Sequence, residues 1–167
     1  KPEIFSNAKN GSFDKEGNKV GFFHVMVAEI VDQRGRWIGE QHTFLGDGVK
    51  AAVPTPRKIH GKSQVGMVRL FAAAKHIGIA EGIETAIAAH ELYGLPVWSV
   101  ISANGMRAFE PPSGIESVTI FGDNDLNGVG QRASQACADR LSSLGLRVNV
   151  HIPDVPCTDF NDFIISA

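Results

Sequence analysis

Two aspartates, Asp123 and Asp125, stand one residue apart in a polar turn that follows an apolar run, residues 118–121. The run is short and rich in β-branched residues, which is typical of a buried strand in a parallel sheet. Open α/β sheets bind ligands just beyond the carboxyl ends of such strands. Carboxylates this close repel each other unless a cation lies between them, and Mg²⁺ suits a site with few protein ligands. The spacing therefore predicts a magnesium site.

Two other kinds of structure are compatible with this turn. Residues 123–128 fit the opening of a calcium-binding EF-hand loop. That loop needs a Glu at its twelfth position and a helix in front of it, whereas this chain has Ser134 there and a predicted strand in front. The EF-hand is therefore set aside. A turn that binds no ligand remains the alternative, because Asp, Asn and Gly also form turns for local reasons.

The composition is that of an ordinary soluble protein, with 43% hydrophobic and 20% charged residues among 167. No apolar run is long enough to cross a membrane and no signal peptide is evident, so we expect a cytoplasmic protein without a membrane partner. Cys137 and Cys157 form no C-x-x-C pair, which argues against a cysteine-based zinc site and favours a reducing compartment. Because the chain begins at Lys1 without Met, we expect a piece of a longer protein.

Charge is distributed unevenly along the chain. Residues 1–75 hold 12 basic and 7 acidic side chains, a balance of +5, whereas residues 76–167 hold 4 and 11, a balance of −7. This asymmetry predicts that the first part contacts a polyanion and the second part holds cations. We therefore divide the chain into a basic β-rich subdomain, 1–75, and an α/β domain, 76–167.

The first part contains two strand patterns, residues 22–31 and 36–45, and a turn at 32–35 that predicts an antiparallel hairpin. Residues 1–19 show little periodicity and are expected to be a partly ordered lead-in. A basic loop follows at 57–62. Its side chains and one further arginine are candidates for contacts with phosphates: Arg57, Lys58, Lys62 and Arg69.

From His76 the pattern changes to alternating strands and helices, which predicts βαβ units around a parallel sheet. Strands are expected at 77–80, 97–102, 118–121 and 146–152, helices at 84–93 and 131–144, and a connection at 103–114. Cys137 lies on the apolar face of the second helix, so it belongs to the core. A short final helix is expected to begin at the acidic turn 159–162.

Two acidic motifs in this order resemble the Toprim domain of topoisomerases and primases, most strongly the version in phage- and plasmid-type DNA primases. The first reads IAEGIETA at residues 79–86 and the second reads FGDNDLNG at 121–128. The segment PRKIHG at 56–61, with VRL at 68–70, is similar to the region that precedes Toprim in these primases. The resemblance covers most of the chain from about Phe22 onward and implies a Toprim-like α/β fold preceded by a small β-rich subdomain.

The resemblance also implies a role for each matched residue. Glu81 corresponds to the general acid or base that acts on the 3′-oxygen, and it is a further candidate metal ligand. Asp123 and Asp125 correspond to the pair that holds Mg²⁺, for which Mn²⁺ can substitute. Asp159 or Asp162 supplies a further acidic group.

The sequence departs from the family at one position. Housekeeping primases carry an acid four positions after the glutamate, where this chain has Thr85, with Glu84 one residue earlier. The role of Glu84 therefore stays open.

The implied function is a primase core that joins NTPs into RNA primers on single-stranded DNA and cooperates with a helicase domain or protein. A Toprim nuclease or topoisomerase would cut phosphodiesters with the same acids, although the sole tyrosine, Tyr93, lies at a predicted helix end and is poorly placed as a nucleophile. A catalytically silent module that binds nucleic acid is the third alternative.

Overall fold

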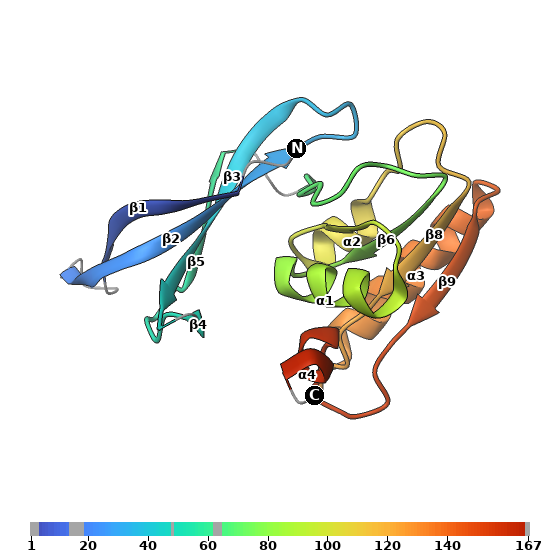
Figure 1. Ribbon diagram of the computed structural model, residues 1–167. Coiled ribbons are helices and arrows are strands. Elements are labelled where there is room, and N and C mark those ends of the chain that lie inside the picture. The colour runs from blue at the N-terminus through green and yellow to red at the C-terminus, as the bar shows by residue number, and fades with distance from the viewer. Residues whose placement is uncertain (1–3, 14–18, 48, 62–64, 166–167) are drawn as a thin grey trace.

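The computed structural model describes residues 4–13, 19–47, 49–61 and 65–165. Within them, the first part of the chain forms an antiparallel sheet and the second part forms a parallel sheet covered by helices on both faces (Figure 1). The predicted α/β architecture with a β-rich N-terminal part is confirmed. None of the helices in these residues has the length and apolar character that crossing a bilayer requires.

The parallel sheet has the strand order β7-β6-β8-β9. Its elements alternate along the chain as β6 (His76–Ala80), α1 (Ile83–Tyr93), β7 (Val97–Ser99), α2 (Ala103–Ala108), β8 (Ser117–Phe121), α3 (Val129–Ser143), β9 (Arg147–His151) and α4 (Phe160–Ile165). All five residues of β8 are buried, as its apolar sequence predicts for a central strand. The order brings β6 and β8, which precede the two acidic motifs, side by side.

Alternate side chains of these strands enter two different cores, because successive residues of a strand point to opposite faces. Ile77, Ile79, Val118 and Ile120 pack with the buried residues of α2 and α3. Ala80 and Phe121 pack instead with α1 and with Phe160 of α4. The three layers hold the strand ends in place, so the side chains that follow those ends are positioned by a rigid sheet.

The antiparallel sheet contains β1 (Ile4–Phe13), β2 (Lys19–Val31), β3 (Trp37–Gly46), β4 (Val49–Lys50) and β5 (Arg57–Gly61). The expectation of a partly ordered lead-in at 1–19 was wrong over residues 4–13, because β1 pairs with β2. Residues 1–3 and 14–18 of that lead-in lie outside the described residues. Long-range pairing supplied the order that local periodicity did not predict.

The basic segment at 57–62 is also different from its prediction as a loop. Residues 57–61 form β5, which pairs with β3 so that Arg57 lies opposite Thr43 and Ile59 opposite Gln41. Directly opposed residues share a face of a sheet. Gln41 is in turn opposite Ala28, a residue of the core shared with α1. Arg57 therefore lies on the face of the antiparallel sheet that packs against the helical part.

Residues 67–68 join the two sheets through backbone hydrogen bonds. Met67 pairs with Val31 of β2, with both N–H···O distances 2.9 Å, and Val68 pairs with Ser99 of β7 at 2.7 and 3.1 Å. Val68 is buried in the same core as Ile30 and Ile83. Backbone pairing and a common core thus fix the antiparallel sheet relative to the parallel one.

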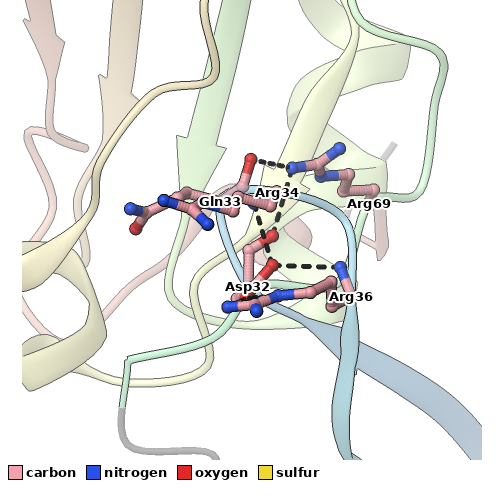
Figure 2. Close-up of polar contacts among 5 residues, drawn as sticks. All are labelled: Asp32, Gln33, Arg34, Arg36 and Arg69. Carbon is pink, nitrogen blue, oxygen red and sulfur yellow. Dashed lines mark hydrogen bonds and ion pairs between the residues drawn. The ribbon is translucent and has the colours of Figure 1, made fainter.

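Arg69 reinforces this junction (Figure 2). Its Nη2 donates to the backbone oxygens of Asp32 at 3.2 Å and Gln33 at 2.8 Å, in the turn between β2 and β3. Its guanidinium carbon lies 4.9 Å from the centre of the Trp98 ring, within the range of a cation–π interaction. The Arg69 side chain is therefore engaged inside the fold.

Replacing Arg69 by Met should lower the free energy of unfolding by about 1–3 kcal/mol, because two backbone oxygens lose a charged donor. Met keeps much of the apolar stem, so the loss reports mainly on the hydrogen bonds. Urea unfolding of the variant measures it. Arg34→Met, at an exposed position of the same turn, is the control. Equal midpoints for the two variants would show that Arg69 does not secure the junction.

Candidate active site

The two acidic motifs meet at one edge of the parallel sheet. Ala80, the last residue of β6, pairs with Phe121, the last residue of β8. Glu81 follows the first of these directly, and Asp123 follows the second after one glycine. Since parallel strands end at the same edge, the fold brings together acids that lie about forty residues apart in the chain.

The carboxylates at this edge are close enough to change one another's proton affinity. Burial, then the charges of Glu81, Asp159 and Asp125, raise the pKa of Asp123 to about 7. Burial, followed by the charge of Asp125, also raises the pKa of Glu81. Like charges held together in a partly buried place are unstable without a cation. The arrangement thus has the electrostatic character of a cation site.

The environment of Asp123 and Asp125 fits a divalent metal. Oδ1 of Asp123 is buried and has no hydrogen-bond partner in the protein. Buried polar atoms are normally paired, so an unpaired carboxylate oxygen here fits a ligand such as a metal ion. Oδ2 of Asp125 accepts a hydrogen bond of 2.9 Å from the Gly130 N–H, which orients that carboxylate. A Cβ on Gly130 would lie 2.8 Å from the Asp123 backbone oxygen, so only glycine allows this close approach.

Within the described residues, no three His, Cys, Asp or Glu side chains form a complete metal-binding group. Mg²⁺ is compatible with such a site, because it commonly takes one or two carboxylates and completes its shell with water and substrate phosphates. Asp123 and Asp125 are the residues that would hold it. The donor set contains oxygen and no sulfur, which favours Mg²⁺ or Mn²⁺ over zinc.

Asp159 and Asp162 lie beside this pair at the start of α4. Together with Asp123 and Asp125 they line an open cleft of about 390 Å³. Oδ1 of Asp159 accepts from the Asn161 N–H at 2.8 Å, and Oδ2 of Asp162 accepts from the Asp159 N–H at 2.9 Å, so both carboxylates cap the helix. Of the two, Asp159 contributes to the raised pKa of Asp123.

The positions after Glu81 have structural partners of their own. Thr85 is buried, and its hydroxyl donates to Oδ2 of Asp159 at 3.1 Å, which ties α1 to α4. Glu84 forms an ion pair of 3.0 Å with Lys50 of β4. We therefore assign Thr85 to positioning Asp159, and Glu84 to the junction between the two sheets.

The loop between β7 and α2 supports Glu81. The Ser99 hydroxyl donates to the Glu81 backbone oxygen at 2.7 Å, and the Ala103 N–H donates to the Glu81 carboxylate and lowers its pKa in part. Between these residues, Ile101 has φ 74°, a conformation that costs a β-branched residue on the order of 1–3 kcal/mol. Strain is therefore stored next to the candidate catalytic carboxylate.

Residues 103–108, predicted as part of a connection, form α2 instead. The Ser102 hydroxyl caps the helix by accepting from the Gly105 N–H at 3.1 Å. A Cβ on Gly105 would lie 1.9 Å from the Val100 oxygen, so the tight approach of loop and helix requires glycine. The N-cap serine was the local signal for this helix, but its six residues are too few for a clear periodicity.

The charges of two arginines lower the pKa values of carboxyl groups at the acidic edge. The charge of Arg57 lowers the pKa of both Glu81 and Asp123 in part, and the charge of Arg107, on α2, does so for Glu81. Lys58 lies on the opposite face of its sheet from Arg57, with Nζ 5.3 Å from the centre of the Phe44 ring. Lys62 lies outside the described residues. Sequence reasoning missed Arg107, because the helix that carries it was not predicted.

Metal binding should weaken as the solution is acidified through about pH 7, where the raised pKa of Asp123 lies. Below that pH the carboxyl holds a proton that the metal must displace, and above it the proton is already gone. The expected change in Mn²⁺ affinity approaches tenfold per pH unit below the pKa. Titration of Mn²⁺ followed by electron paramagnetic resonance measures it. An affinity that does not change between about pH 6 and 8 would contradict this assignment.

Comparison with known proteins agrees with this geometry. A family model described as a Toprim domain matches residues 76–167, more than half of the chain. The chain therefore belongs to the Toprim domain family. A search of curated proteins by sequence finds no match.

The solved structures with a similar fold include primase domains. The primase fragment of the bacteriophage T7 primase-helicase protein aligns with a TM-score of 0.56 at 20% identity, over 86% of this chain and 58% of that one. A DNA primase domain from Pseudomonas aeruginosa aligns with a TM-score of 0.58 at 17% identity, over 95% and 51%. A DnaG primase catalytic domain bound to single-stranded DNA gives 0.59 at 14% identity, over 93% and 53%. This chain thus spans little more than half the length of these structures.

Proposed function

We propose that this chain is the catalytic core of a DNA primase, which joins ribonucleotides into primers on a single-stranded DNA template. The observation that carries the proposal is the meeting of Glu81 with Asp123 and Asp125 at one edge of the sheet. The primase-like fold supports it. The proposal includes NTPs and single-stranded DNA as ligands, a helicase as a partner domain or protein, and a cytoplasmic setting.

Each residue has a chemical task in this proposal. Asp123 and Asp125 would hold Mg²⁺, which would neutralise charge at the triphosphate when bound. Glu81 takes the proton from the attacking 3′-hydroxyl, the 3′-oxygen bonds to the α-phosphorus, and the bond to the β-phosphate oxygen breaks to release pyrophosphate. Burial raises the pKa of Glu81, which makes its carboxylate a stronger base than that of an exposed glutamate.

Arg57, which lies on the antiparallel sheet, binds phosphate oxygens of the substrate or template. It is exposed, and within the described residues it forms no ion pair that would occupy its guanidinium. Its position on the inner face of the antiparallel sheet places a positive charge across from the acids. Lys58, on the opposite face of the same sheet, and Lys62, outside the described residues, stay predicted contacts with the template backbone, which would be bound with little regard to base sequence.

Primer synthesis tests the proposal. The protein is incubated with a single-stranded template, NTPs and Mg²⁺, alongside Asp123→Ala and Glu81→Ala and the control Asp139→Asn, an exposed acid on α3. We expect primers from the wild type and the control and none from the other two. Synthesis that survives in Asp123→Ala or Glu81→Ala would overturn the proposal. Metal-dependent nicking without incorporation of nucleotides would assign the same acids to a nuclease.

A further inference from the structure

A second cleft, also of about 390 Å³, lies outside the acidic edge. Its walls come from the turn between β2 and β3, the segment that joins the two sheets, the end of α2, and α3. Its lining includes Asp32, Gln33, Arg107, Ala108, Glu110 and Arg140. We call it the arginine cleft. Its volume falls in the range of small-molecule sites, about 300–1,000 Å³, and suits a single nucleotide.

Arg140 is held in a fixed position in this cleft. Its Nε donates to the Arg107 backbone oxygen at 3.1 Å, and its Nη2 donates to the Phe109 backbone oxygen. These bonds cap the end of α2, and a third joins the guanidinium to the Cys137 thiol, which leaves two of its five N–H groups for a ligand. A preorganised guanidinium with donors left over is well suited to bind a phosphate.

The charge of the cleft is positive despite its two acids. Asp32 is neutralised by Arg36, whose Nη2 lies 2.7 Å from Oδ2, and it also accepts hydrogen bonds from the Arg34 and Arg36 N–H groups. Only Glu110, which is exposed, then opposes Arg107 and Arg140. Arg69 adds a third guanidinium behind the rim, where its donors hold the backbone of Asp32 and Gln33 (Figure 2).

Arg107 connects this cleft to the candidate catalytic carboxylate. Its side chain lines the cleft, and its charge also acts on Glu81. Arg107 also lies one helical turn after Ala103, whose N–H donates to the Glu81 carboxylate, so a phosphate bound by Arg107 would lie near Glu81. The acidic cleft, in contrast, is lined by four aspartates and repels anions that bring no metal. The arginine cleft therefore suits an anion that brings no metal, and the acidic cleft suits one that binds together with a metal.

We propose that the arginine cleft binds the attacking nucleotide, with a phosphate on Arg107 and Arg140 and its 3′-hydroxyl directed toward Glu81. This inference rests on the proposed function, since it names the substrate group that occupies the Glu81 side of the same site. The incoming triphosphate and its metal then occupy the side of Asp123 and Asp125. The separation explains how one site keeps two anionic reactants apart until they react.

Binding of AMP in the absence of divalent metal tests this, because the acidic cleft repels AMP under those conditions. AMP is titrated into isotope-labelled protein, and chemical shifts in nuclear magnetic resonance spectra give the site and the dissociation constant. We expect shifts at α2 and the β2–β3 turn. Arg107→Gln should weaken binding about tenfold or more, as loss of a charged hydrogen bond does. Adenosine, which lacks the phosphate, should bind much more weakly than AMP.

Two further variants serve as a second test of AMP binding and as its control. Ala108→Glu adds a negative charge at an exposed position of the cleft, so it should abolish AMP binding without disturbing the core. Arg147→Gln, an exposed arginine at the start of β9, should leave binding unchanged. Shifts confined to the acidic cleft, no binding by the wild type, or wild-type affinity in both Arg107→Gln and Ala108→Glu would overturn the inference.

The outcome for the cleft is separate from the outcome for primase activity. Specific AMP binding by a protein that makes no primers would leave the cleft assignment standing and remove the proposed function. Suppose instead that the protein makes primers but binds AMP equally well with Arg107→Gln and with Ala108→Glu. The proposed function would then stand, and the cleft assignment would be overturned.

Discussion

Asp123→Asn is expected to abolish primer synthesis, lowering the rate at least about 10³-fold, while making the metal-free protein more stable at about pH 8. Activity falls because the buried Oδ1, which has no partner in the protein, is the oxygen best placed to bind the metal. Stability rises because the asparagine removes a carboxylate that burial and three neighbouring acids disfavour. The two effects have opposite signs, as expected where function is maintained at the expense of stability.

The pH dependence of stability follows from the direction of the pKa shift. The pKa of Asp123 is raised in the folded state from 3.8 to about 7, so between these values the folded protein binds more protons than the unfolded chain. Stability of the metal-free protein therefore falls as the pH rises through this window. The cost is complete above about pH 7 and absent near the lower value.

Thermal unfolding of metal-free protein measures this effect. Because the cleft is open to water, solvent screening limits the cost of the ionised Asp123 carboxylate in the folded state to about 1–2 kcal/mol. Removing that cost corresponds to a rise in Tm of about 2–8 °C for Asp123→Asn at about pH 8. The same comparison near pH 4 should show no gain, since Asp123 is then protonated in the folded state. A variant that is less stable than the wild type at the higher pH would contradict the electrostatic account of this site.

Glu81→Gln should lower the rate of nucleotidyl transfer about 10²–10⁴-fold, the usual contribution of a general base, and weaken Mn²⁺ binding far less than Asp123→Asn. Gln preserves the size of the side chain but cannot accept the proton from the 3′-hydroxyl. The Ser99 contact to the Glu81 backbone is unaffected by the change. The fold should therefore be retained.

Single-turnover primer extension, with Mn²⁺ affinity measured in parallel, separates these roles. Glu84→Gln is a matched control, since that carboxylate pairs with Lys50. If Glu81→Gln lost metal binding to the same extent as Asp123→Asn, Glu81 would be a metal ligand rather than a base.

The parallel sheet and its acidic edge could be predicted from the sequence because both depend on local signals. Strands β6 and β8 are apolar runs that stop at polar residues, and parallel strands end at a common edge. Glu81 and the aspartate pair follow those ends directly. Their meeting needs only the pairing of the two strands, so little information beyond the motifs was required.

Other features depend on partners that are distant in the chain. Residues 57–61 carry no alternating pattern and become β5 only because β3 offers an edge for pairing. The role of Arg69 requires the β2–β3 turn and Trp98 to meet at one place. The bond from Thr85 to Asp159 requires α4 to return to α1. The pattern of a single sequence does not encode such long-range contacts. Only the fold therefore revealed α2, the role of Arg107 and the arginine cleft.

The central claim is that Asp123 and Asp125 bind one divalent ion within reach of Glu81. Crystals of the protein soaked in Mn²⁺ and measured at the manganese absorption edge test it most directly, because anomalous density locates the ion without any assay of activity. We expect one strong peak between the two aspartates on the side of Glu81. A peak held by Asp159 and Asp162 alone, or no peak at this edge of the sheet, would contradict the claim.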